Sequence, residues 1–255
     1  MGEAFGHIPA TGALLALALA GLTGGLSRGF SGFGAALVFV PFAAAAVGPR
    51  DAIPVLALME CVACLAFLPG AWRHAVRRDA ATMSAGAVLG VPLGALILAN
   101  SDPLVLRWSL CALVLLAVVV LGSGWRWHGK ARPSLTVTVG AVGGVMSGAA
   151  MLGGVPPATY WLGAAGADAR TVRANMNLYF AALTAIVTAA FAWQGLIGWR
   201  TFWFALAAGP AYGSGLWAGS RLFWLASDRV FRVVAYGMIL ASAIFGLPLW
   251  DGMLR

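Results

Sequence analysis

The stretch GLTGGLSRGFSGFGAALVFVP, residues 21–41, lies in an apolar part of the chain but contains six glycines, two serines and one arginine. Irregular backbone is tolerated at membrane depth only where protein or water covers the freed N–H and C=O groups. Glycine allows such backbone because it has no Cβ and reaches positive φ at little cost. Arg28 adds a permanent positive charge, since a guanidinium does not lose its proton in proteins. The stretch therefore indicates either a broken membrane segment that binds an anion, or an interfacial turn whose Arg28 reaches toward lipid headgroups.

The composition of the whole chain is that of a membrane protein. Of its 255 residues, 61% are hydrophobic and 9% are charged, whereas about 25% are charged in an ordinary soluble domain. Several apolar runs reach the length of about 18 residues that a bilayer core demands. We therefore expect an all-α polytopic membrane protein in contact with the lipid bilayer. The net charge is +8, and its basic residues fall in short loops between apolar runs. Orientation in the membrane explains such residues, so we expect no nucleic-acid partner.

Apolar segments divide the chain into two halves and a basic link. Each segment is a candidate helix, which gives about 8–10 hydrophobic helical segments in one transmembrane domain, residues 1–255. The segment at 154–166 is short and contains Pro156 and Pro157, so it need not span the membrane by itself. The first repeat covers about 10–122, with segments at 10–26, 30–48, 52–70, 80–99 and 104–121. The link covers 123–133, and the second repeat covers about 134–250, with segments at 134–152, 154–166, 174–193, 201–220 and 230–249.

The two halves are similar in sequence. Seven glycines of the first half recur 119 positions later in the second half, and a fixed period of this kind is the signature of an internal repeat. They are Gly21, Gly24, Gly25, Gly29, Gly34, Gly90 and Gly94, and their copies are Gly140, Gly143, Gly144, Gly148, Gly153, Gly209 and Gly213. This similarity predicts a tandem duplication.

Charge indicates how the halves are oriented. Loops rich in basic residues are predicted to be cytoplasmic, and they contain Arg73, Arg77 and Arg78, Arg126, Lys130 and Arg132, and the basic residues of 167–173 and 221–232. The other loops and both termini carry at most one basic residue each. This distribution of basic loops requires each half to cross the membrane an odd number of times. Each half then has five crossings, or three crossings and a re-entrant hairpin. We therefore predict two inverted repeats, each with a Gly-rich interrupted or re-entrant segment, an arrangement found in secondary transporters.

Polar residues that should converge at the glycine segments are the candidate site. Small hydroxyls and free N–H groups suit an oxyanion, which accepts several hydrogen bonds at once. The alternative for the serines is helix packing, because Ser and Gly allow close approach. The predicted substrate-binding residues around Arg28 are Ser27, Ser31, Gly32, Gly34, Ser147 and Gly148.

Three further residues are candidates within apolar runs. Asn175 and Asn177 begin an apolar segment, where an amide could donate to the substrate or could instead cap a helix end. Glu60 is the acidic residue deepest within an apolar run. Because an unpaired buried carboxylate is costly, Glu60 is either a proton-coupling group or the structural partner of Arg28. Cys61 and Cys64 form a C-x-x-C, but without a βαβ pattern they are better explained as small packing residues.

The chain resembles the TauE/SafE family of sulfite-exporter-like membrane proteins. The resemblance rests on residues 21–41 and on their copy GAVGGVMSGAAMLGGVPPATYW at 140–161. Each is followed by an apolar helix, a turn (WRHAVRRD or GLIGWR) and a G-x-x-x-G helix (GVPLG or GPAYG). The resemblance covers roughly residues 12–250 and implies an exporter of sulfite or small organosulfur anions such as sulfoacetate. Ser147 stands where the first copy has Arg28, so any site is asymmetric.

We therefore expect a multi-pass protein of the bacterial inner membrane that exports a small anion by alternating access, with protons as the candidate coupling ion. An anion channel or an integral membrane enzyme are the alternatives. Against an enzyme, His7, His74 and His128 lie near a terminus or in loops, so we predict no catalytic or metal-binding residue. No cofactor is indicated. The G-x-x-x-G helices could pack within one chain or between the two chains of a homodimer.

Overall fold

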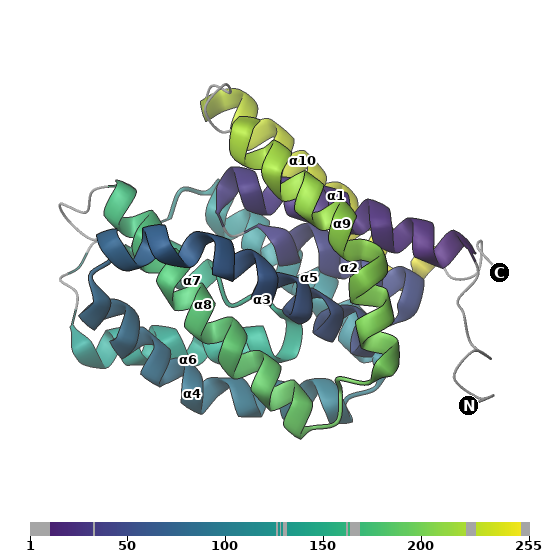
Figure 1. Ribbon diagram of the computed structural model, residues 1–255, viewed down its shortest axis with the longest axis horizontal. Helices are drawn as coiled ribbons and strands as arrows, with labels where there is room; N and C mark the ends of the chain where they lie inside the picture. Colours follow the sequence, from purple (N-terminus) through teal and green to yellow (C-terminus); the bar gives the residue numbers. More distant parts are fainter. Residues whose placement is uncertain are drawn as a thin grey trace.

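The computed structural model describes residues 11–32, 34–125, 127, 129, 132–161, 163, 169–222 and 228–250, without the side chains of 169, 228–236 and 250. Within this part the chain forms ten α-helices, one short 3-10 helix and no strand (Figure 1). The first half contains α1 (Thr11–Ser31), α2 (Ala35–Val47), α3 (Pro49–His74), α4 (Arg77–Asn100) and α5 (Pro103–Gly122). The second half contains α6 (Pro133–Ala150), α7 (Val155–Trp161), α8 (Ala169–Trp193), α9 (Trp199–Leu222), α10 (Asp228–Gly246) and η1 (Pro248–Trp250).

The all-helical prediction is confirmed, and each predicted apolar segment coincides with one helix. Among the described residues, six helices are long and apolar enough to cross a membrane: α1, α3, α4, α5, α6 and residues 170–193 of α8. The chain is therefore an integral, multi-pass membrane protein. The short segment at 154–166 contains only α7, whose first turn holds Pro156 and Pro157, where proline is tolerated. Among the predicted basic and histidine residues, Arg126, Lys130, His7 and His128 lie outside the described residues.

Glycine faces join two pairs of helices, α1 with α9 and α4 with α6. Gly25 of α1 lies so close to α9 that an added Cβ would come within 2.1 Å of the Tyr212 carbonyl oxygen. On α6, an added Cβ at Gly140 would lie 1.9 Å from the Met83 carbonyl oxygen of α4. In each pair the contacts advance in the same direction along both helices, so each pair is parallel. Close approach through small residues is the usual way in which helices pack in a bilayer.

The 119-residue offset relates α1 to α6 but does not relate α4 to α9. Gly90 of α4 packs against Ala141, and the glycine that makes the corresponding contact on α9 is Gly215, which packs against Leu22. Gly209 has no neighbour within 4 Å of an added Cβ. The predicted matches of Gly90 with Gly209 and of Gly94 with Gly213 are therefore wrong, because extra residues precede the packing face of α9. That the halves are inverted repeats in a membrane stays a prediction.

Short breaks separate α1 from α2 and α6 from α7. Gly32 follows α1 with a φ of +84°, and Met151 follows α6 with a φ of +58°. These residues are 119 positions apart, which is the offset of the predicted repeat. Helix α1 packs directly on α2, so the two helices form a hairpin.

Helices α3 and α8 cross in the middle of the molecule (Figure 1). The Cys64 thiol lies 3.9 Å from the Thr184 hydroxyl, and the Cys61 thiol lies 3.3 Å from the Thr188 hydroxyl, so the helices run antiparallel. The end of α3 and the start of α8 therefore meet. We call this end of the bundle the basic end, because Arg73, Arg77, Arg78, Arg170 and Arg173 lie there.

The register of α9 on α1 is tested by two substitutions on one helix. In Gly219→Ala the new Cβ would lie 2.2 Å from the Leu26 carbonyl oxygen, so we expect a loss of about 1–3 kcal/mol of stability. In Gly213→Ala the Cβ meets nothing within 4 Å, and alanine's better helix propensity should leave stability unchanged or raise it by up to about 1 kcal/mol. Thermal unfolding in detergent measures both. Equal losses in the two variants would contradict this register.

Candidate functional site

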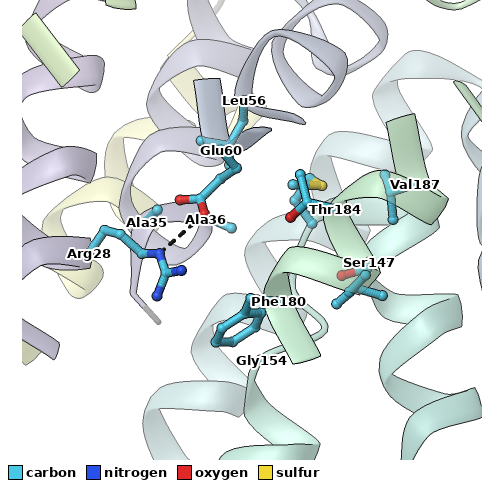
Figure 2. Close-up of a pocket in the computed structure, with 12 residues that line it drawn as sticks. Arg28, Ala35, Ala36, Leu56, Glu60, Ser147, Gly154, Phe180, Thr184 and Val187 are labelled. Carbon is cyan, nitrogen blue, oxygen red and sulfur yellow. Dashed lines mark hydrogen bonds and ion pairs between the residues drawn. The ribbon is translucent and has the colours of Figure 1, made fainter. Parts of the chain in front are cut away.

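A small cavity lies where the α1–α2 and α6–α7 breaks meet α3 and α8 (Figure 2). Its volume of about 30 Å³ is room for about two water molecules. Its lining combines one charged pair and two hydroxyls with apolar side chains. The lining residues are Arg28, Ala35, Ala36, Leu56, Glu60, Ser147, Met151, Gly154, Phe180, Leu183, Thr184 and Val187.

Arg28 and Glu60 form a buried ion pair at one wall of the cavity. Arg28 Nε donates to Glu60 Oε2 at 3.2 Å, and the two side chains are 3% and 8% exposed. The Tyr212 hydroxyl of α9 donates to Glu60 Oε1, and the Cys64 thiol lies 3.8 Å from Glu60 Oε2. A buried charge is tolerated when it is paired and hydrogen-bonded in this way. Glu60 is therefore paired with Arg28 in this structure, and its role in proton coupling stays a prediction.

One nitrogen of the Arg28 guanidinium has no hydrogen-bond acceptor among the described residues. Arg28 Nη2 is buried and makes no hydrogen bond within the described part of the chain. The guanidinium carbon lies 4.8 Å from the ring centre of Phe180 and 5.9 Å from that of Phe67. The faces of these rings attract a cation but provide no hydrogen-bond acceptor in its plane. A buried charged donor without an acceptor marks a place for an anion oxygen or a water.

The start of α2 adds further donors beside Arg28. Ala35 and Ala36 form the first turn of α2 and line the cavity. The first N–H groups of a helix have no acceptor within the helix, and the helix dipole favours negative charge there. Together with Arg28, this helix start makes one wall of the cavity suited to a small anion.

The predicted residues in the first break build the turn and do not line the cavity. Ser31 Oγ donates to the Ser27 carbonyl at 2.7 Å and accepts the Gly34 N–H at 2.9 Å, while Ser27 Oγ donates to the Gly34 carbonyl at 3.2 Å. A Cβ on Gly34 would lie 2.3 Å from Ser27 Oγ, which explains the glycine. Ser27, Ser31, Gly32 and Gly34 thus hold the start of α2 in place.

Of the remaining predicted residues, one lines the cavity and three have other positions. Ser147 is buried and lines the cavity. Gly148 instead packs on α4, where an added Cβ would lie 2.3 Å from the Val91 carbonyl oxygen. Asn175 Oδ1 accepts the Val76 N–H at 2.7 Å, so this amide holds the α3–α4 turn. Asn177 is half-buried on α8 and is not among the lining residues. The structure therefore brings Arg28, Glu60 and Ser147 together out of the predicted set.

Sequence reasoning missed Phe180, Thr184 and Tyr212. Phe180 and Thr184 lie one turn apart on α8, and their spacing alone could have placed them on one face. Tyr212 is 152 residues from Glu60, and a single tyrosine in an apolar helix gives no signal for that contact.

A family model described as sulfite exporter TauE/SafE matches residues 17–246. The match begins in α1 and ends with α10, so it includes every residue that lines the cavity. No curated protein and no solved structure matches the chain.

The Arg28–Glu60 pair gives a prediction about stability. Glu60→Met should cost about 3–5 kcal/mol, because the Arg28 charge would remain buried without a partner. The double variant Arg28→Met/Glu60→Met removes both charges and should lose much less than the sum of the single variants. Chemical or thermal unfolding in detergent measures the coupling. Additive losses would contradict a coupled buried pair.

Proposed function

We propose a substrate and a mechanism for this chain, which belongs to the sulfite exporter TauE/SafE family. The family and the six spanning helices make it a membrane transporter of the sulfite exporter type. Our proposal is a secondary transporter of the bacterial inner membrane that exports sulfite or a small organosulfur anion such as sulfoacetate. The observation that carries this proposal is the buried Arg28 Nη2, which has no acceptor among the described residues and belongs to a side chain that lines the cavity.

The proposed binding mode uses donors from both halves of the chain. An oxyanion placed beside Arg28 Nη2 would accept from the guanidinium and from the first-turn N–H groups of α2. The hydroxyls of Ser147 and Thr184 lie across the same cavity and can donate to other oxygens of the anion (Figure 2). Space for about two water molecules is too small for sulfite, which has four heavy atoms. Binding therefore requires side chains at the cavity to move, and the described arrangement is a closed one.

Glu60 would couple proton binding to anion binding, because its carboxylate and the anion compete for Arg28. The groups that face this carboxylate are Arg28 from α1, Tyr212 from α9 and Cys64 from α3 itself. When Glu60 is charged, its pairing with Arg28 offsets the positive charge that attracts the anion. A protonated Glu60 would leave the full charge of Arg28 to the substrate. Proton binding and anion binding would then favour each other, so the two would leave the cell together and the outward gradient of the anion would drive export.

Alternating access would use the two hairpins at the cavity. Arg28 and Ser147 occupy corresponding positions of the two halves, 119 residues apart, and both line the cavity. We propose that the α1–α2 and α6–α7 hairpins move relative to α3 and α8, so that the cavity opens first to one side and then to the other. Saturable transport with counterflow would distinguish this carrier from an anion channel.

The charge of Arg28 should be essential for transport. In inside-out vesicles we expect saturable, proton-dependent accumulation of sulfite or sulfoacetate, and Arg28→Gln should lower its kcat/KM by about thirtyfold or more. Arg50→Gln is the matched control, because Arg50 is exposed and bonds the Ser101 carbonyl far from the cavity. If the wild type transports the anion and Arg28→Gln has the same kcat/KM, Arg28 does not bind the substrate.

The role of Glu60 is tested by the pH dependence of transport. Glu60→Gln keeps a hydrogen-bonding group of the same size but cannot exchange a proton. We therefore expect initial rates to become independent of pH, and accumulation to stop responding to an imposed proton gradient. A wild-type pH profile in Glu60→Gln would leave the carboxylate with a structural role only.

A further inference from the structure

One face of α8 continues from the cavity to the basic end of the bundle. Phe180, Thr184 and Val187 line the cavity from this face. Residues three, four and seven positions apart lie on the same side of a helix. Asn177 is three residues before Phe180, and Arg173 is four residues before Asn177, so both extend the cavity face toward the start of α8.

The burial of these two residues fits a position between helices. Arg173 and Asn177 are both half-buried, whereas Arg170, one turn earlier, is exposed. At a rise of about 1.5 Å per residue, the backbone of Arg173 lies about 10 Å before that of Phe180 along the helix axis. A long arginine side chain covers much of that distance.

Arg28 approaches the same path from the other side. Its guanidinium lies against the rings of Phe180 and Phe67, and Phe67 is seven residues beyond Glu60 toward the basic end of α3. The charged head of Arg28 is therefore displaced from Glu60 toward that end.

Two cations on the same side of the cavity favour an anion that must lose its hydration there. In the closed arrangement, Glu60 already offsets the charge of Arg28. An anion that leaves water at this point needs a second cation to replace its hydration.

We propose that Arg173 is the first cationic contact of the transported anion at the basic end, and that Asn177 and then Arg28 follow it along the path to the cavity. This inference rests on the proposed function and deepens it. It assigns to Arg173 the capture of a small sulfur oxyanion from the side that carries the basic loops. Arg173 therefore determines the affinity for the anion, while Arg28 remains the residue inside the cavity.

The test is transport of radiolabelled sulfite by the full chain in liposomes, at several sulfite and salt concentrations. Arg173→Gln should raise KM about tenfold or more, as for the loss of a charged hydrogen bond, while Vmax stays within about twofold. The dependence of KM on salt should weaken, because one cation no longer attracts the anion. Arg173→Lys should restore most of the affinity.

Arg170→Gln is the matched control, because it removes the same charge from an exposed position on the same helix. Its KM should stay within about twofold of the wild-type value. An unchanged KM in Arg173→Gln, or an equal rise in Arg170→Gln, would overturn the inference. A loss of Vmax alone would also overturn it, since it would indicate a structural role.

Binding of sulfite to the purified protein separates this inference from the proposed function. Calorimetry should detect sulfite binding to the wild type and a weaker interaction with Arg173→Gln. If the wild type and Arg173→Gln bind sulfite equally well, the role of Arg173 is overturned and the proposed function stays in place. A wild type that neither binds nor transports sulfite or sulfoacetate would contradict both.

Discussion

The buried pair of Arg28 and Glu60 is the interaction on which the site depends. A lone charge inside a membrane protein is costly, and each of these groups makes the other tolerable. The pair also requires Tyr212, whose hydroxyl donates to Glu60 while its backbone packs against Gly25 of α1. The glycine face of α1 therefore has two effects. It lets α9 approach closely, and it brings the hydroxyl that completes the hydrogen bonding of Glu60.

The two halves turn the chain at positions 119 residues apart, but the residues around these turns differ in chemistry. Gly32 and Met151 turn the chain at corresponding positions with positive φ, which is easy for glycine and costs a methionine free energy. Arg28 of the first half corresponds to Ser147 of the second. One side of the cavity therefore carries the charges, and the other carries hydroxyls and apolar side chains. Such asymmetry suits an anion with one strongly polar end.

Much of the fold could be predicted from the sequence, because apolar runs and their lengths are enforced by the bilayer. Arg28 and Glu60 were also predictable, since ionisable residues in apolar runs are rare and need partners. The roles of Ser27 and Ser31 were not predictable, because a serine that caps a turn and one that binds a ligand look alike in sequence. The partner of Glu60 on α9 and the true register of Gly215 depend on long-range packing that no local pattern encodes.

The central claim is that Arg28 binds the transported anion in the cavity. The most direct measurement is the position of a heavy-atom analogue, selenite, by anomalous diffraction from crystals of the full chain. Our account predicts a selenium peak beside Arg28 Nη2, between the start of α2 and the hydroxyls of Ser147 and Thr184. A peak at another place, or an empty cavity at saturating selenite, would contradict it.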